Sequence, residues 1–354
     1  MGKTMNLYNL GKIPWEESQL IYHALGYMGQ EALSLVSPAS PYVCIGYNQD
    51  AEQEVDLKYC EENNIPVFRR EVGGGAVYLD GNQLFYQVIL RMDNPAVTKN
   101  KGLFYKKMLQ PVIAVYRHIG IEAQYKPIND VIVETRKISG TGAAEIGDCV
   151  VFVGNLIVDF DYKTMSRVLR VPDEKFRDKV HKTLRDNLST IRREIGNEKA
   201  SHWDETTLNT LLAKEFEKVL GPLSASDRDT ALDQKMDDLR ARMINDAWLF
   251  QKGKKWTKGR DIKIRQGTNL RHKVHKAPGG LIRADIEIIE GRMGRVSLSG
   301  DFFCYPAKAI DWLESGLNGI RFHDVETFLD SFYKEKRIET PGITIKDWLT
   351  VLSD

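Results

Sequence analysis

The chain lacks several features that would assign it to a specialised class of protein. Its 354 residues carry 50 basic and 49 acidic side chains, so bulk charge gives no reason to expect nucleic acid or a membrane surface as a partner. Its four cysteines are widely separated and form no CxxC pair, which argues against a zinc site or a disulfide framework. We therefore expect reduced thiols and a cytoplasmic location.

Long apolar runs are also missing. The longest strongly apolar stretch, Val150 to Val158, is much shorter than the roughly 20 residues that a transmembrane helix needs. The N-terminal segment MGKTMNLYNL has no apolar core of the kind that signal peptides carry. No internal repeat or low-complexity segment is present. These absences predict an ordinary soluble protein that has no membrane partner. We also expect the protein to be a monomer.

The sequence does contain a succession of helical and extended patterns. Apolar residues recur at helical spacing in three stretches, which are Glu16 to about Val36, Leu103 to His118 and Asp204 to Leu220. Short runs rich in Val, Ile, Phe and Tyr predict strands, at Tyr42 to Tyr47, Ala76 to Leu79, Gln83 to Leu90, Asp130 to Val133 and Cys149 to Val158. This order indicates an α+β fold with a mixed sheet rather than a regular βαβ repeat.

The length predicts two domains, at about 150 residues each. We place the connection at Gly221 to Arg242, which is polar and charged and has a helical pattern in its later half. Strands and helices are expected after it, at Ile262 to Gln266, Leu281 to Ile289, Arg295 to Leu298, Ala307 to Glu314, Val325 to Tyr333 and Ile345 to Leu352. The predicted domains are residues 1–245 and a smaller α/β domain, residues 246–354.

The most informative segment is RREVGGGAVYLD, from Arg69 to Asp80. Three consecutive glycines remove every Cβ from one turn, so the backbone can approach a ligand closely and adopt positive φ. The arginines can offer a planar fork to phosphate or carboxylate. Of the two, we expect Arg70 to matter more, and Arg69 less if its side chain faces solvent. The same residues are also consistent with a glycine-rich hairpin whose arginines are solvated.

A second segment, KPINDVIVETRKISGTGAA, runs from Lys126 to Ala144. Lys137 can bring a positive charge to a carbonyl or phosphate oxygen, and the small residues after it leave room for a ligand. Asn129 and Asp130 offer oxygen atoms that suit Mg²⁺. Taken alone, the segment also fits a turn followed by a solvated basic pair.

Together the two segments resemble the lipoate-protein ligase family, within the wider biotin and lipoate ligase group. The family marks are an RRxxGGGAV segment and a later ND…RKxSG segment, and both occur here in order. The resemblance extends to PYVCIGYNQD, from Pro41 to Asp50, and to PGGLIRADIEIIEGRMGRVSLSGDFF, from Pro278 to Phe303. It implies a biotin/lipoate ligase-like mixed sheet domain with an accessory domain like that of bipartite ligases.

The resemblance implies an ATP-dependent ligase that activates lipoate or octanoate as an acyl-adenylate and transfers it to a lysine of a lipoyl-domain acceptor. Acceptors of this kind are the H-type protein of glycine cleavage and the E2 component of 2-oxoacid dehydrogenases. ATP, Mg²⁺ and lipoate are the implied ligands, and Lys137 is the implied catalytic residue, contacting the acid and the α-phosphate. The implied substrate-binding residues are Arg70, Gly73, Gly74, Gly75, Ala76, Val77, Tyr78, Asn129, Asp130, Ser139, Gly140, Thr141, Gly142, Ala143 and Asn155, with Asp130 also bordering the metal.

The chain departs from the family pattern at two places. Val153 stands where the family often has histidine, in Val153-Gly154-Asn155, and Leu79 replaces a frequent histidine after GGGAV. These changes leave open whether lipoate or octanoate is preferred. A C-terminal domain that covers the site during activation is a further expectation.

Three other interpretations compete with this one. An octanoyl or lipoyl transferase of the same fold would need a nucleophilic cysteine near the second segment, where KPIND has none. Biotin ligase fits the glycine segment less well. A non-catalytic module that docks carrier domains is the third, because Val153 stands where the family often has histidine.

The basic stretch KGKKWTKGR runs from Lys252 to Arg260. It fits a solvated loop better than a patch that binds nucleic acid.

Overall fold

The computed structural model describes residues 4–98, 100–171, 173–253, 262–265 and 268–353. The chain divides into two compact units, each assembled from separate stretches. The first contains Met1–Val43, Lys58–Pro66 and Val77–Ile244, and the second contains Cys44–Leu57, Val67–Ala76 and Asn245–Asp354. The second unit thus takes two short segments from the N-terminal part of the chain. The domain boundary between residues 245 and 246 stays a prediction.

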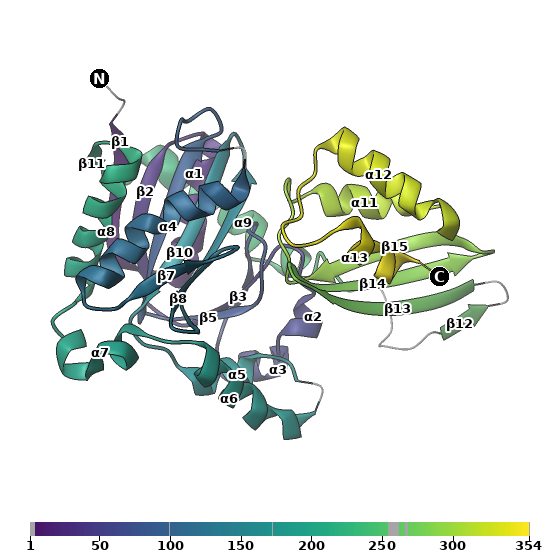
Figure 1. Ribbon diagram of the computed structural model, residues 1–354, viewed down its shortest axis with the longest axis horizontal. Coiled ribbons are helices and arrows are strands. Elements are labelled where there is room, and N and C mark those ends of the chain that lie inside the picture. The colour runs from purple at the N-terminus through teal and green to yellow at the C-terminus, as the bar shows by residue number, and fades with distance from the viewer. Residues whose placement is uncertain (1–3, 99, 172, 254–261, 266–267, 354) are drawn as a thin grey trace. The chain divides into compact units, whose positions relative to one another are not determined.

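An eight-stranded mixed sheet organises the first unit (Figure 1), with the strand order β11-β1-β2-β6-β10-β9-β8-β7. The pairs β11–β1 and β1–β2 are parallel, and all later neighbours are antiparallel. The strands are β1 Met5–Ile13, β2 Ala32–Pro38, β6 Gln83–Arg91, β7 Ala123–Lys126, β8 Asp130–Val133, β9 Arg136–Ile146, β10 Cys149–Ile157 and β11 Leu223–Ala225. This is the α+β arrangement with a mixed sheet that the sequence predicts.

Helices cover both faces of this sheet. Alternate residues of β6, beginning with Leu84 and Tyr86, join one core with α4 (Lys101–His118) and α8 (Glu205–Leu220). On the opposite face, Gln87 Nε2 donates to the Ser18 carbonyl at 2.6 Å, and Ser18 belongs to α1 (Trp15–Met28), which packs on α9 (Thr230–Met243). The first unit also contains, before α8, the helices α3 Leu57–Glu62 (all but its first residue), α5 Tyr162–Val168, η1 Glu174–Phe176, α6 Arg177–Asn187 and α7 Ile191–Ala200.

The first helix is shorter than predicted. It ends at Met28 because Gly29 adopts φ 67, a left-handed C-cap whose N–H bonds to the carbonyls of Gly26 and Leu25. The following residues form β2, which is buried along its whole length. The expectation of a helix to Val36 is therefore wrong beyond Met28, since a fully buried strand and a helix can show the same apolar density.

The segment Gly221 to Arg242, where we place the connection between domains, belongs to the first unit. Its later half is α9, as predicted, but Leu232, Met236 and Leu239 of this helix are buried. β11 joins the edge of the main sheet by pairing with β1. The segment therefore packs into the first unit, because a thin apolar stripe is enough to bury one face of an otherwise charged helix.

The second unit contains an antiparallel sheet with the order β12-β13-β14-β15. Its strands are β12 Ile262–Arg265, β13 Thr268–Ala277, β14 Gly280–Ile289 and β15 Arg292–Gly300, and its helices are α11 Ala309–Leu317, η2 Phe322–Asp324, α12 Val325–Lys336 and α13 Ile345–Leu352. Strands β13, β14 and β15 and the helices share one apolar core around Phe302 and Trp348. The sequence predicts these elements except β13 and η2. In the main sheet, it does not predict the strands β1, β2, β7, β9 and β11.

Shorter elements lie in the remaining segments. Strands β3 (Tyr42–Ile45), β4 (Val67–Arg69) and β5 (Val77–Leu79) form a small sheet in the order β4-β3-β5, and the short helices are α2 (Ala51–Glu54) and α10 (Asp246–Leu249). Among the described residues, no helix is both long enough and apolar enough to cross a membrane.

Candidate functional site

Lys137 lies on β9 of the first unit, where its side chain is held by a carboxylate. Its Nζ lies 2.6 Å from Oδ1 of Asp130, on the neighbouring strand β8, and the Lys137 side chain keeps 37% of its surface exposed. The Lys137 carbonyl accepts from the Ser189 amide at 2.7 Å. The backbone is thus fixed, while the ammonium group is oriented and still open to solvent.

Gly140 leaves the space that this lysine occupies. A Cβ on Gly140 would lie 3.3 Å from Lys137 Cε and 3.6 Å from its Nζ. Any larger residue would press on the ammonium group from the same strand. The glycine therefore helps to set the position of Lys137, which the letters RKISG do not reveal by themselves.

A chain of hydrogen bonds links the central strands behind Lys137. The Gly140 amide donates to Asn155 Oδ1 at 3.0 Å, and Asn155 Nδ2 donates to Gln83 Oε1 at 2.8 Å. Gln83 Nε2 in turn donates to the Tyr78 carbonyl at 3.1 Å. Four segments of the first unit are therefore connected by two side-chain amides, with Asn155 at the centre.

Ser139 is fully buried and forms hydrogen bonds with residues of two other strands, β10 and β6. Its Oγ donates to the Asn155 carbonyl at 2.6 Å and lies 2.9 Å from the Tyr86 hydroxyl. A Cβ on Gly154 would overlap with that hydroxyl, which explains the glycine before Asn155. Burial raises the pKa of Tyr86, so the phenol stays protonated. We conclude that Ser139 is a packing and hydrogen-bonding residue in this structure.

The other small residues of β9 continue the strand. Asn129 Nδ2 donates to the Thr141 carbonyl at 2.5 Å, and Thr141 Oγ1 donates back to the Asn129 carbonyl. Gly142 and Ala143 pair with Val153 and Phe152 of β10. The turn that carries Asn129 is therefore fastened to β9 beside Lys137.

Val77 and Tyr78 belong to β5 in the first unit, whereas Arg70 and Gly73 to Ala76 belong to the second. Arg70 Nη2 donates to the carbonyls of Gly73 and Gly75, at 2.8 and 3.0 Å, and Nη1 donates to the Cys44 carbonyl at 3.1 Å. The guanidinium fork thus organises the glycine segment itself. The sequence instead suggests that this fork binds a phosphate or carboxylate, or that it is solvated.

Arg69 corrects one expectation. Its side chain does not face solvent but is fully buried, in the second unit. It donates to five carbonyls, those of Gly46, Tyr47, Gln49, Trp248 and Leu249. Burial lowers its pKa to about 10. Arg69 is therefore a structural residue, and the carbonyls that surround it come from positions that no local pattern connects to it.

The oxygen atoms near Lys137 fit a metal only in part. Among the described residues, no group of three or more His, Cys, Asp or Glu side chains could hold a metal ion. Asp130 is the carboxylate of this region, and one of its oxygens already contacts Lys137. Such a donor set suits an ion like Mg²⁺ that is held by one protein carboxylate and the phosphates of a substrate.

All four cysteines are buried and none forms a disulfide. Burial raises the pKa of Cys149 to about 11. Burial also raises the pKa of Cys44, more than the adjacent Arg70 lowers it. A thiolate is the nucleophile in cysteine chemistry, and these surroundings disfavour it.

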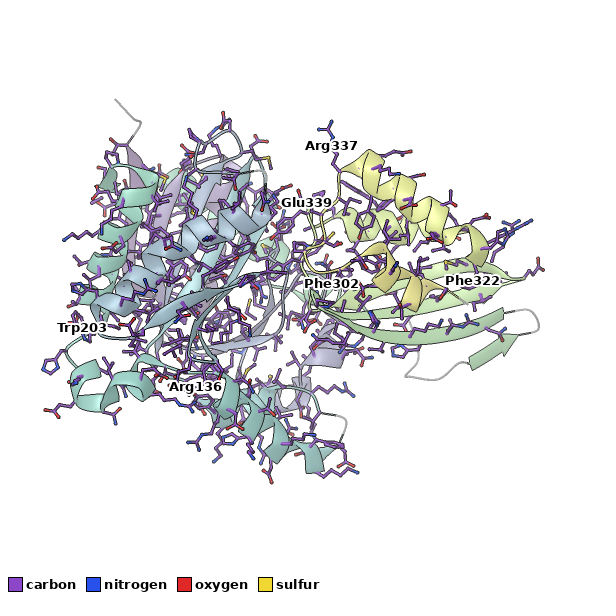
Figure 2. All side chains as sticks on the ribbon, in the orientation of Figure 1. Arg136, Trp203, Phe302, Phe322, Arg337 and Glu339 are labelled. Atoms are coloured by element: carbon purple, nitrogen blue, oxygen red, sulfur yellow. The ribbon has the colours of Figure 1, made fainter. Side chains whose placement is uncertain are left out.

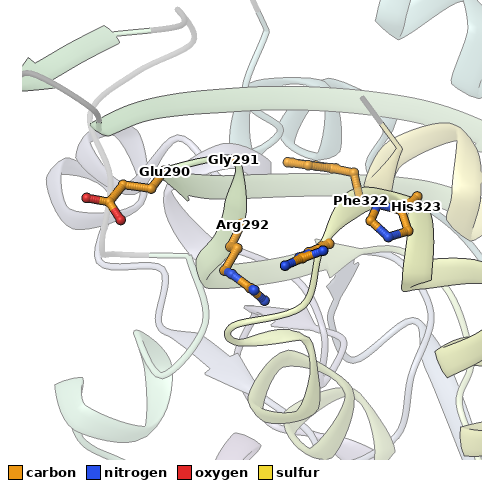
Figure 3. Close-up of a pocket in the computed structure, with 6 residues that line it drawn as sticks. Glu290, Gly291, Arg292, Phe322 and His323 are labelled. Carbon is orange, nitrogen blue, oxygen red and sulfur yellow. The ribbon is translucent and has the colours of Figure 1, made fainter.

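Two further regions lie apart from the predicted residues. An open pocket in the second unit, with a volume of about 640 Å³, is lined by residues of the β14–β15 turn and of η2, including Arg292, Phe322 and His323 (Figure 3). Most of the basic stretch, residues 254–260, lies outside the described residues. Lys252 is described, and it is not solvated: its buried Nζ contacts Asp311 and Glu314.

The ammonium group of Lys137 is oriented by the Asp130 carboxylate and lies on a strand of small residues. These features define a class of protein that binds an anionic group or a carbonyl oxygen. The chain belongs to the lipoyl protein ligase A/B catalytic domain family, whose model matches residues 15–217.

Named relatives include both ligases and transferases. Lipoate-protein ligase A subunit 1 of Thermoplasma acidophilum is 35% identical over 159 residues, which is 42% of this chain and 59% of that protein, less than two thirds of its length. Lipoate-protein ligase LplJ of Bacillus subtilis is 28% identical over 264 residues, 74% of each chain. Octanoyltransferase LipM of Kyrpidia tusciae is 24% identical, over 67% of this chain and 93% of that protein.

Solved structures share the fold. A bi-partite lipoate protein ligase of Thermoplasma acidophilum, studied with its E2 lipoyl domain, is 25% identical with a TM-score of 0.59, over 70% of this chain and 97% of that chain. LipL1 of P. falciparum, in complex with lipoate, has a TM-score of 0.66 at 19% identity, over 98% of this chain and 97% of that chain. The second likeness concerns the fold alone.

Proposed function

We propose that this member of the family is an ATP-dependent lipoate-protein ligase, which forms an acyl-adenylate and transfers the acyl group to a lysine of a lipoyl-domain acceptor. The observation that carries the proposal is Lys137, whose Nζ lies 2.6 Å from Asp130 while its side chain stays 37% exposed. A cation that is oriented and reachable suits charge stabilisation on a bound phosphate or carbonyl. The names of the ligase relatives support the same activity.

In the first half-reaction, a carboxylate oxygen of lipoate attacks the α-phosphorus of ATP, and the bond to pyrophosphate breaks. Negative charge on the α-phosphate oxygens grows in the transition state. Lys137 would stabilise this charge, and Asn155 would keep the strand beneath it in place through its bond to the Gly140 amide. Asn129 and Thr141 would hold the adjoining turn.

In the second half-reaction, a neutral lysine amine of the acceptor attacks the acyl carbonyl, AMP leaves, and the amine proton passes to solvent. Lys137 would then face the developing oxyanion, so one residue would serve both steps without a covalent enzyme intermediate. Orientation of the adenylate would supply much of the rate. Arg70 would contribute by holding the glycine segment at Gly73 and Gly75.

Magnesium is a proposed part of this reaction. When bound, the ion would neutralise phosphate charge, and Asp130 is the residue that would hold it. We assign the remaining substrate contacts to the glycine segment with Val77 and Tyr78, and to the small residues of β9. A mass-shift assay with lipoate and octanoate as alternative acids measures which of the two is preferred.

An octanoyltransferase is the second candidate, because a LipM relative matches 67% of the chain. A transferase of that kind passes its acyl group through a cysteine thioester. The cysteines of this chain are buried, and the pKa of Cys149 is raised to about 11 by that burial. Their surroundings favour the ligase.

A mass-shift assay tests the proposal. The protein is incubated with lipoate or octanoate and a lipoyl-domain acceptor, either an E2 domain or an H-type protein, with and without ATP. We expect the acceptor mass to rise by one lipoyl or octanoyl group only when ATP is present. Acylation from an octanoyl carrier protein without ATP would instead favour the transferase, and failure with every donor would favour a docking module.

A further inference from the structure

The segment after β15 contacts the glycine segment within the second unit. The Gly74 amide donates to the Phe302 carbonyl at 3.3 Å. A Cβ on Gly73 would lie 2.7 Å from that carbonyl oxygen and 3.1 Å from the Phe303 ring, and a Cβ on Gly74 would lie 3.1 Å from Phe303 Cζ. Two of the three glycines are therefore required by close packing against Phe302 and Phe303.

This contacting segment is firmly anchored. Phe302, labelled in Figure 2, is fully buried and meets Trp348 edge to face, with ring centroids 5.5 Å apart. Asp301 accepts a hydrogen bond from the Leu281 amide, and the Gly300 amide donates to the Asn48 carbonyl at 2.9 Å. The backbone around Phe303 is thus fixed to the core of the C-terminal sheet.

The glycine segment is held from two sides. Arg70 Nη2 donates to the carbonyls of Gly73 and Gly75 and would lie 3.2 Å from a Cβ on Gly74. The Phe303 ring lies against the same two glycines, Gly73 and Gly74, and is only partly buried. The backbone of Gly46 and the Phe302 carbonyl also lie against Gly73 and Gly74. A loop without side chains has no packing of its own, so its conformation depends on these neighbours, among which the Phe303 ring is the aromatic contact.

We propose that Phe303 is a positioning residue for acyl-adenylate formation. Its ring keeps Gly73 to Gly75 in the conformation that receives the adenylate, so the C-terminal sheet takes part in the first half-reaction through one aromatic contact. The inference rests on the proposed ligase function.

Replacing Phe303 by alanine leaves a ring-sized gap beside Gly73 and Gly74. We expect lipoate-dependent ATP–pyrophosphate exchange to fall between about 10- and 100-fold, the range for a misplaced binding group. The KM for ATP should rise more than the KM for lipoate. Transfer from presynthesised lipoyl-adenylate should fall less, because that ligand is already formed. Phe303→Tyr keeps the ring and should restore exchange.

The test measures both half-reactions and the melting temperature for the wild type, Phe303→Ala, Phe303→Tyr and the control Phe322→Ala, which removes another partly buried ring of the same unit. If the alanine variant melts early, Phe303→Leu, which keeps apolar volume without the Cζ contact, replaces it. Wild-type or faster exchange in the variant, or equal loss of both half-reactions, would overturn the inference. Absence of exchange in the wild type would instead contradict the proposed function.

Discussion

The Lys137 region and the glycine segment are held in place by different means. Lys137, Gly140 and Asn155 lie on adjacent strands of one sheet, and their hydrogen bonds run along that sheet. The glycine segment has no such ladder: Arg70 and the backbone around Phe302 contact it, and Phe302 is remote in sequence. A site residue on a central strand inherits its position from the fold, whereas a glycine loop depends on particular side chains.

Because of this difference, the contacts of the two regions can be predicted from the sequence to different extents. Around Lys137, Gly140 leaves room for the lysine side chain, and its ion-pair partner Asp130 lies within the same sequence segment. Around Gly73, a missing Cβ suits an approaching ligand, but it equally suits the Phe302 carbonyl. A glycine read from the sequence alone therefore cannot distinguish a binding surface from a packing surface.

We expect the largest effect from Arg69→Ala, because Arg69 connects several segments of the second unit, which contains Gly73 to Gly75. Five carbonyls would lose a charged donor in a buried place, a loss of about 3 kcal/mol or more in unfolding free energy. We expect a clear drop in melting temperature together with loss of all activity. Thermal unfolding measured beside the exposed control Arg292→Ala checks this, and equal melting temperatures would contradict it.

Lys137→Ala tests the sheet-held region. We expect acyl-adenylate formation to fall about 10²- to 10³-fold, as when one charge-stabilising donor is removed. The fold should persist because this side chain is partly exposed and contacts Asp130 at the surface. Circular dichroism and pyrophosphate exchange on the same sample separate the two effects. Unchanged exchange in a folded variant would remove Lys137 from the mechanism.

Gly140→Ala sharpens the comparison, since it alters the position of Lys137 without removing it. The new Cβ would lie 3.3 Å from Lys137 Cε, and we expect adenylation to slow by about tenfold through misplacement of the ammonium. Gly120→Ala is a poor control because its φ of 88° is itself strained for alanine. Gly102→Ala, in the first turn of α4, is preferable and should leave the rate unchanged.

The smallest effect is expected from the cysteines. Replacing all four by serine or alanine should keep adenylation and transfer within a few-fold of wild type, allowing for some packing loss. Because burial raises the pKa of Cys149 to about 11, its thiol stays protonated at neutral pH and should alkylate slowly until the pH approaches that value. An acyl thioester recovered on any cysteine by mass spectrometry would contradict this prediction.

Three strands of the main sheet, β6, β8 and β10, could be predicted from the sequence, whereas β1, β2, β7, β9 and β11 were not predicted. The strand Asp130–Val133 and the helix over Asp204 to Leu220 follow from local patterns, and the structure has both, as β8 and α8. The end of α1 at Gly29 was missed because β2 continues the apolar pattern. Arg69 was misjudged because its burial depends on carbonyls near Trp248, a contact that only folding creates.

The central claim is that this protein activates its acid with ATP, and lipoate-dependent exchange of labelled pyrophosphate into ATP measures that step directly. The assay needs no acceptor and no transfer. The account predicts exchange that requires lipoate or octanoate, is lost in Lys137→Ala and survives replacement of the cysteines. Absence of exchange in the wild type, with acyl transfer from a carrier protein proceeding without ATP, would contradict it.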